Sequence, residues 1–180
     1  TKRNYVATTK EAEKLYAASS LMGKSVKEIT NNFIDSGVQV GKIGDQIEQG
    51  FNYVRSVGAN AKEIMGDVEK NISKINQYNF EGGVLGLTRM ATQASLLRFD
   101  MNETFKLADK VMKPEGAIEM AAAFQRLGVA AGDLTDPFAL MNKSINDPEG
   151  LQKSVINVAK QFSYFDEETK TFKINPQGIL

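Results

Sequence analysis

Carboxylates are the side chains of this sequence whose type and spacing come nearest to catalytic chemistry. Three of them, Asp166, Glu167 and Glu168, are adjacent near the C-terminal end of the chain. A glycoside hydrolase needs two acids that are held in a cleft with separated pKa values. Adjacent acids in a polar turn point into water instead, so we predict that these three residues make the turn soluble.

A second group of acids, Asp133, Asp136 and Asp147, has the residue type of a calcium loop but not its spacing. The alternating ligands and the closing Glu of such a loop are absent. Asp136 and Asp147 each precede a proline, an order typical of a helix start, where the acid caps free N–H groups. We therefore expect no bound metal, and we assign two of the three acids to helix caps.

Several other kinds of active site are excluded, because the chain lacks the residue types that they need. It contains no Cys and no His, which excludes thiolate nucleophiles and the commonest general base. The glycine-rich segment 82–86 is followed by no Lys and preceded by no predicted strand, so we interpret it as a linker. The 22 basic and 22 acidic residues balance, and Arg89, Arg98 and Arg126 are scattered. We expect no catalytic residues, no cofactor and no specific nucleic acid.

The length of 180 residues allows one domain, or a smaller domain with an elongated arm. No window approaches the roughly 18 uncharged apolar residues of a membrane helix, so we expect no membrane span in this segment. The sequence stops directly after the turn signal at 175–178, where a new apolar segment would begin. We therefore expect it to be a fragment of a longer chain.

The strongest pattern among the predicted elements is a seven-residue apolar repeat in the first half. From Leu15 onward, apolar residues step by three and four, which indicates helix. A strict seven-residue repeat is kept in register by supercoiling against partner helices, so we predict a coiled-coil arm over about residues 15–78. It would extend about 90 Å if it were helical throughout at ~1.5 Å per residue. The repeat consists of Val26, Phe33, Val40, Ile47, Val54, Ala61, Val68 and Ile75.

The predicted seam of this arm would be a contact between copies of the chain. β-Branched residues at both seam positions favour more than two strands, so we expect a homo-oligomer and favour a trimer. Six glycines, from Gly37 to Gly66, each cost about 1 kcal/mol in a helix interior, so the arm would need several copies or an enclosing wall. The predicted self-association residues are Val26, Ile29, Phe33, Val40, Ile43, Ile47, Val54, Val57, Val68 and Ile75. The alternative is a pair of amphipathic helices inside one globular domain, broken near residues 37–44.

The second half differs from the first in its helix-breaking residues, because all four prolines lie beyond residue 110. We place the boundary between the two parts at the break 79–83. The predicted domains are the arm, 1–79, and a helical domain, 80–180. Helices are predicted over 84–99, 102–112 and 117–127 and after Pro137 and Pro148. Alternating residues at 163–165 and 171–174 around a polar turn predict a β-hairpin. The expected fold class is all-α: a long helical arm, then a small bundle of short helices with one C-terminal β-hairpin.

Four short segments of the second half carry a family resemblance: Ala121–Gly128, Asp136–Met141, Asn146–Gln152 and Tyr164–Glu167. Over about residues 80–180 the chain resembles tail tape measure proteins and related tail-lumen virion proteins of large bacteriophages. The resemblance rests on capping and packing residues, so no functional residue is carried over. It implies a structural protein inside the tail of the virion that sets tail length during assembly and leaves ahead of the genome.

The resemblance also implies the partners: further copies of the chain, and the tail tube or tail hub proteins. The predicted arm fits a ruler. Three features depart from the family pattern: the seven-residue repeat is short for a ruler, and a membrane-active segment and a peptidoglycan-cutting site are both lacking. One alternative is an ejected cargo or internal core protein of the virion without a ruler role. Another is a cellular coiled-coil adaptor, which would carry charged residues beside the seam.

Overall fold

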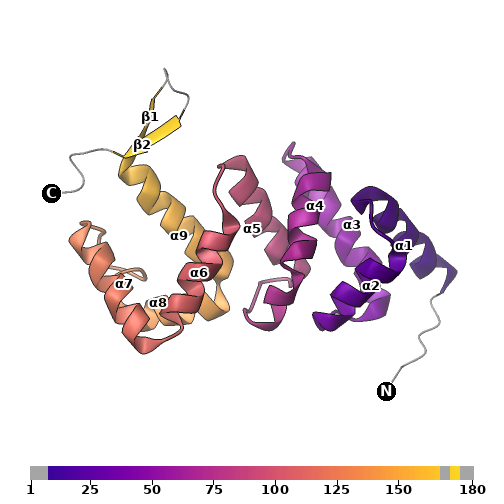
Figure 1. Ribbon diagram of the computed structural model, residues 1–180, viewed down its shortest axis with the longest axis horizontal. Coiled ribbons are helices and arrows are strands. Elements are labelled where there is room, and N and C mark those ends of the chain that lie inside the picture. Colours follow the sequence, from indigo (N-terminus) through magenta and orange to yellow (C-terminus); the bar gives the residue numbers. More distant parts are fainter. Residues whose placement is uncertain (1–7, 167–170, 175–180) are drawn as a thin grey trace. The chain divides into compact units, whose positions relative to one another are not determined.

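Short helices make up the first half of the chain in the computed structural model, which describes residues 8–166 and 171–174. The chain divides into two compact units, Thr1–Met101 (unit 1) and Asn102–Leu180 (unit 2). Figure 1 shows the order of their elements. Unit 1 contains α1 (Thr9–Met22), α2 (Val26–Asp35), α3 (Val40–Ser56), α4 (Ala61–Lys70), the 3-10 helix η1 (Ile72–Asn76) and α5 (Val84–Leu96).

Three glycines divide α1 to α4 into separate helices. Gly23, Gly37 and Gly58 adopt left-handed backbone with φ of 68°, 79° and 73°, a conformation that ends helices and suits glycine. Ser25 and Asn60 then start α2 and α4, because each side chain accepts a bond from the backbone N–H of the third helical residue. Stop and start signals therefore follow one another within a few residues.

The long coiled-coil arm predicted for residues 15–78 is wrong. The chain instead folds back at each glycine, and the longest helix of this region is α3, with 17 residues. The joints at 23–25, 36–39 and 57–60 leave the seven-residue spacing uninterrupted, so the apolar repeat runs through turns as well as helices. The structure is closer to the alternative, amphipathic helices packed inside a globular unit with a break near Gly37.

The core of unit 1 is centred on α3, which contacts α1, α2, α4 and α5. Ile47 and Val54 of α3 are buried, as are Ile64 of α4 and Met90 of α5. Gly50 permits close packing here, because a Cβ at this position would lie 3.0 Å from Sδ of Met65. The buried apolar side chains that we assigned to an intermolecular seam thus form an intramolecular core.

The boundary between the two parts lies at 101/102 rather than at 79/80. Helix α5 packs against α3 and α4 and so belongs to unit 1. Gly82 and Gly83, both with positive φ, form the turn that leads into α5, and the N–H of Gly83 donates to the carbonyl of Phe80 at 2.9 Å. The glycine pair marks a helix start inside a unit, not a linker between units.

Unit 2 contains the predicted helices, except that the one predicted over 117–127 begins three residues earlier, at Pro114. They are α6 (Met101–Val111), α7 (Pro114–Arg126), α8 (Pro137–Asn146) and α9 (Pro148–Gln161). Helix α8 contacts both α7 and α9, with Leu140 and Leu151 fully buried. Gly116 lets α7 begin against the end of α6, because a Cβ there would lie 2.2 Å from the carbonyl oxygen of Lys110.

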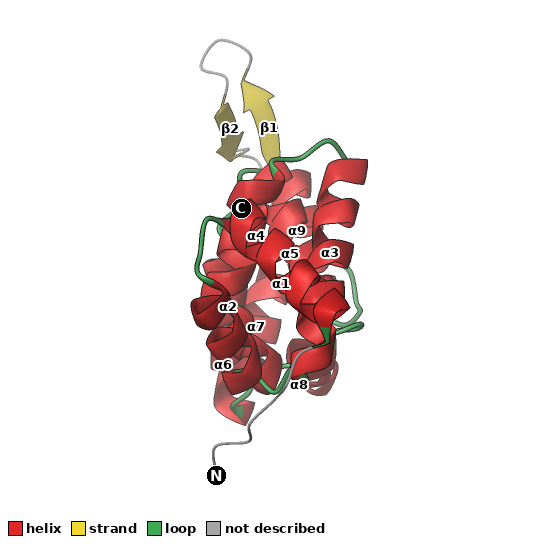
Figure 2. Ribbon diagram, turned by 90° about the vertical axis from the view of Figure 1, so that its right-hand side faces the viewer, coloured by secondary structure: helices red, strands yellow, loops and turns green. Residues whose placement is uncertain are grey.

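Two short strands follow α9 (Figure 2), and they match the ranges of the predicted β-hairpin except that Asp166, predicted in the turn, is the last residue of the first strand. Strand β1 (Ser163–Asp166) pairs antiparallel with β2 (Thr171–Ile174), and Ser163 lies opposite Ile174. The predicted turn, with Glu167 and Glu168, lies outside the described residues. The all-α fold class is confirmed for the described part of the chain.

Candidate functional site

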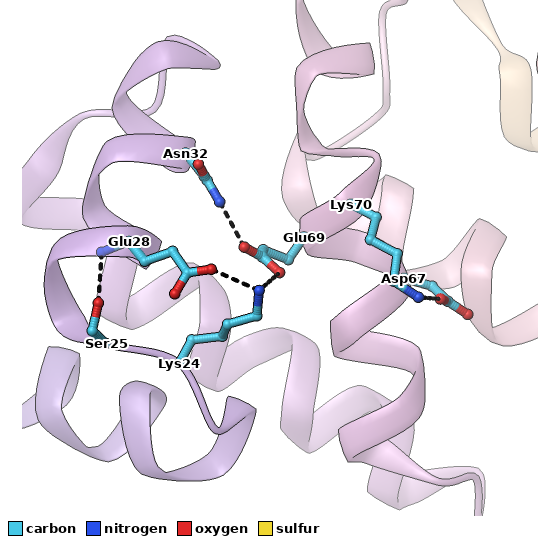
Figure 3. A network of polar contacts seen from close by, with 7 residues as sticks. All are labelled: Lys24, Ser25, Glu28, Asn32, Asp67, Glu69 and Lys70. Atoms are coloured by element: carbon cyan, nitrogen blue, oxygen red, sulfur yellow. Dashed lines mark hydrogen bonds and ion pairs between the residues drawn. The ribbon is translucent and has the colours of Figure 1, made fainter.

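Glu69 of α4 is the one charged side chain among the buried residues that the structure describes, with 6% of its surface exposed. The side-chain amide of Asn32, on α2, donates to Oε1 of Glu69 at 2.6 Å. Nζ of Lys24, in the joint between α1 and α2, lies 3.4 Å from Oε2. Figure 3 shows the three side chains converging from two sides of the bundle. One buried carboxylate therefore joins α4 to α2 and to the turn before it.

Local structure positions the cation of this network. Gly23 ends α1 and turns the chain, so that Lys24 stands between that glycine and the capping residue Ser25. Nζ of Lys24 also donates to Oε1 of Glu28 at 2.7 Å. The hydrogen bond to Glu28 and then the attraction of Glu69 raise the pKa of Lys24 above its usual 10.5, against a smaller opposing effect of desolvation. We call Lys24, Asn32 and Glu69 the interhelical clamp.

The clamp was not predicted from the sequence. Glu69 and Asn32 are 37 residues apart, and nothing in the pattern pairs them. The one available signal is that Glu69 stands four residues after Met65, on the apolar side of α4. An acid on an apolar helix face indicates a buried partner. Since its acceptor oxygens meet an amide and an ammonium, the geometry holds helices together rather than offering a free acid.

A second, more exposed network joins α1 to α3. Nζ of Lys14 donates to Asp45 and, at 2.9 Å, to Oε2 of Glu48. These two hydrogen bonds, that to Asp45 first, raise the pKa of Lys14. Gly44 brings the helices together at this point, because a Cβ there would lie 2.6 Å from Cβ of Lys14. The shallow groove beside this contact is lined by residues of both helices, including Leu21 and Arg55.

The acids considered for calcium binding have structural partners. Oδ1 of Asp136 accepts from the N–H groups of Phe138 and Ala139 at 2.8 and 3.1 Å, and Oδ1 of Asp147 accepts from that of Gly150 at 2.8 Å. Both predicted helix caps are confirmed. The third acid, Asp133, pairs with Nζ of Lys143 at 2.9 Å. Each of these acids therefore serves a local contact in unit 2.

The ten predicted self-association residues do not form an exposed seam. Six are fully buried within the fold, three are half-buried, and Val57 alone is exposed, at 43%. A seam of side-by-side copies would require these side chains at the surface, so that prediction is wrong. The buried six are Ile29, Phe33, Ile43, Ile47, Val54 and Val68, and the half-buried three are Val26, Val40 and Ile75.

An exposed aromatic side chain marks the surface of unit 2. Phe138 is 82% exposed at the second position of α8 and lies beside a shallow hollow lined by Gln125, Asp133 and Pro137. The amide of Gln125 donates to the carbonyl of Thr135 at 2.8 Å and so fixes the loop behind this hollow. Phe138 is therefore an exposed aromatic side chain on the first turn of α8, next to a loop that a hydrogen bond holds in place.

Within residues 8–166 and 171–174, no helix combines the length and the apolar character needed to cross a bilayer. The part of the chain that the structure describes also has no group of three acidic side chains close enough to share a metal ion. Comparisons with protein-family models, with curated proteins and with solved structures find no match to this chain.

Proposed function

We propose that this chain is part of a structural protein of a bacteriophage virion, carried inside the tail and released with the genome. The supporting observation is that three of the resembling segments are neighbours in unit 2. Ala121–Gly128 ends α7, Asp136–Met141 begins α8, and Asn146–Gln152 joins α8 to α9. Because α8 contacts both α7 and α9, the three segments lie in one packed group of helices.

Within this class, we propose the role of ejected cargo or internal protein rather than that of a ruler. A ruler derives its length from an extended helix at about 1.5 Å per residue. Unit 1 instead folds the corresponding residues into a bundle whose longest helix, α3, has 17 residues and so spans only about 25 Å. The adaptor alternative also loses its main support, because the residues of its seam are buried within unit 1.

The proposed partners are the tail tube or tail hub proteins. The side chain of Phe138 is the candidate contact on unit 2, because it is the most exposed of the large hydrophobic side chains that the structure describes, and its backbone N–H donates to the capping Asp136. Phe138→Ser should weaken retention in the particle without changing the fold, since the side chain has little packing to lose. A matched change, Asp133→Asn, alters the rim of the same hollow without removing apolar area.

Protease treatment of virions tests the location. In intact particles the tube wall should protect this segment, and particles that have released their DNA should lack it. Peptides of the segment would be quantified by mass spectrometry in both kinds of particle, with a capsid protein as the internal reference. Cleavage in intact particles, or retention after emptying, would contradict a position in the tail lumen.

A measurement of tail length distinguishes the cargo role from the ruler role. Duplication of residues 9–101 in the parent protein repeats unit 1 as a whole, so that each copy keeps its own core. For cargo, electron microscopy should show tails of unchanged length, whereas a ruler would give longer tails. An increase in proportion to the added residues would return the assignment to a tape measure.

A further inference from the structure

The joint between α2 and α3 is held mainly by backbone geometry. It consists of residues 36–39, with Gly37 at φ 79°. The N–H of Gly37 donates to the carbonyl of Ile34 and that of Val38 to the carbonyl of Phe33, both at 2.9 Å, which closes the end of α2. A residue with a side chain would be strained at Gly37, because left-handed backbone disfavours a Cβ.

This joint differs from its neighbours in how the next helix begins. Helix α3 starts at Gln39 without a side-chain cap, whereas Ser25 and Asn60 cap α2 and α4. A continuous helix through the α2–α3 joint would therefore lose no side-chain cap at the start of α3. Next to the joint, the amide of Asn76 donates to the carbonyl of Asp35 at 3.2 Å, and Ser36 of the joint is buried.

The sequence across the joint also fits a continuous helix. Phe33, Val40 and Ile47 are spaced by seven, so in one helix over residues 26–56 they would share a stripe. Such a helix would be about 46 Å long at ~1.5 Å per residue. The repeat that did not produce an arm in the folded chain is thus compatible with a second, straight form of α2 and α3.

We propose that unit 1 can exchange α1 and α2 between two copies of the chain, with the joint at 36–39 as the hinge. In the straight form these helices cannot return to their own α3, α4 and η1, which they contact in the folded chain. They can occupy the same place on a second copy, which is domain swapping, a low-cost route to a dimer. The contacts of Glu69 with Asn32 and Lys24 would then form between chains, with the geometry that they now have within one chain.

Gly37 favours the bent form of the joint over the straight form. It tolerates positive φ in the bent form, and it is a poor helix former in the straight form. Gly37→Ala reverses both preferences. Because a swapped dimer contains two such joints and each should change by about tenfold, we expect the association constant to rise roughly 100-fold.

Sedimentation of the full chain tests the hinge. Gly37→Ala should form dimers at concentrations where the unmodified chain is monomeric. The matched control is Gly58→Ala, which has a similar φ of 73° and no atom within 4 Å of the added Cβ, but precedes the capped start of α4. The control should remain monomeric. Equal dimerisation of both variants would overturn the choice of hinge.

Cross-linking then tests the exchange itself. The chain has no Cys, so Asn32→Cys and Glu69→Cys can be placed on separate chains that also carry Gly37→Ala. After the two chains are unfolded and refolded together, a bismaleimide cross-linker should join Cys at position 32 of one chain to Cys at position 69 of the other in a swapped dimer, because these side chains meet in the fold. A monomer, or a dimer without this link, would overturn the proposal.

If Gly37→Ala does not fold, the same mixture is made without it and refolded at high protein concentration. A chain that carries both cysteines serves as the positive control, because the same cross-linker can join positions 32 and 69 within one monomer. Interchain linkage supports the exchange, and its absence while the positive control closes overturns it. The proposal depends on unit 1 alone and stands independently of the function proposed above.

Discussion

The amide of Asn32 donates to the buried carboxylate of Glu69 at 2.6 Å, and this bond joins two residues that are 37 positions apart in sequence. Helix α2 carries the donor and α4 the acceptor, and Lys24 supplies the compensating positive charge. A buried carboxylate is strongly destabilising when its donors are removed, because its desolvation is then uncompensated. Loss of the interhelical clamp should therefore destabilise unit 1 more than loss of any other polar contact that the structure describes in it.

Asn32→Ala should lower the free energy of opening of α2 and α4 by about 2 kcal/mol, since a hydrogen bond to a charged group is lost. Amide hydrogen exchange of the two helices measures this quantity directly. Glu28→Gln is the matched control: it removes the exposed partner of Lys24, and we expect a change below ~0.5 kcal/mol. Equal effects of the two changes would show that burial of Glu69 does not determine the strength of the clamp.

The raised pKa of Lys24 predicts a loss of stability at alkaline pH. The hydrogen bond to Glu28, followed by the attraction of Glu69, raises this pKa in the folded chain above 10.5. A raised folded-state pKa stabilises fully below the unfolded value, and this contribution is lost as the pH rises through the folded value. The melting temperature should therefore fall above about pH 10.5, more steeply than that of Lys24→Gln.

Lys24→Arg provides the rescue for this prediction. A guanidinium stays protonated throughout this pH range, so the melting temperature of this variant should fall less steeply than that of the unmodified chain. Thermal unfolding followed by circular dichroism from pH 8 to 12 measures all three chains. Parallel curves for the unmodified chain and for Lys24→Gln would show that ionisation of this lysine does not contribute.

The helix caps were predicted correctly from the sequence, because a cap depends only on residues that are close to it in the chain. Asp136 and Asp147 each cap a helix whose first N–H groups lie two or three residues away, and proline follows both. The starts of α8 and α9 could therefore be placed from capping residues, whereas α7 has no side-chain cap and begins three residues before its predicted start. The glycine pair at 82–83 was also recognised as a break, but a helix start within a unit and a linker between units share that signal.

The partners of the apolar repeat could not be read in the same way. Joints of three or four residues preserve the seven-residue spacing, so Phe33 and Val40 look like neighbours on one helix although Gly37 separates them. Periodicity reports which side chains seek burial, but not whether a partner copy or the same chain buries them. The clamp was missed for a related reason, since Glu69 finds its donor through the tertiary fold.

Close packing at Gly44 predicts opposite effects for two glycine substitutions. Gly44→Ala places a methyl group 2.6 Å from Cβ of Lys14, so α1 must shift, and we expect a loss of about 1–3 kcal/mol. Gly66→Ala meets no atom within 4 Å and should stabilise α4 by up to about 1 kcal/mol. Denaturant unfolding of the two variants checks the signs. Stabilisation by Gly44→Ala would show that α1 is not tightly packed on α3.

Unit 2 should fold without unit 1, because its helices carry their own caps and its core includes Leu140 and Leu151. A chain of residues 100–180 should show a cooperative thermal transition. Within it, Asp147→Ala removes the acceptor for the N–H of Gly150 and should cost about 1 kcal/mol. Asp133→Ala removes only an exposed ion pair with Lys143, and we expect less than ~0.5 kcal/mol. A gradual transition without cooperativity would show that unit 2 depends on unit 1, and the 101/102 boundary would then not separate independent domains.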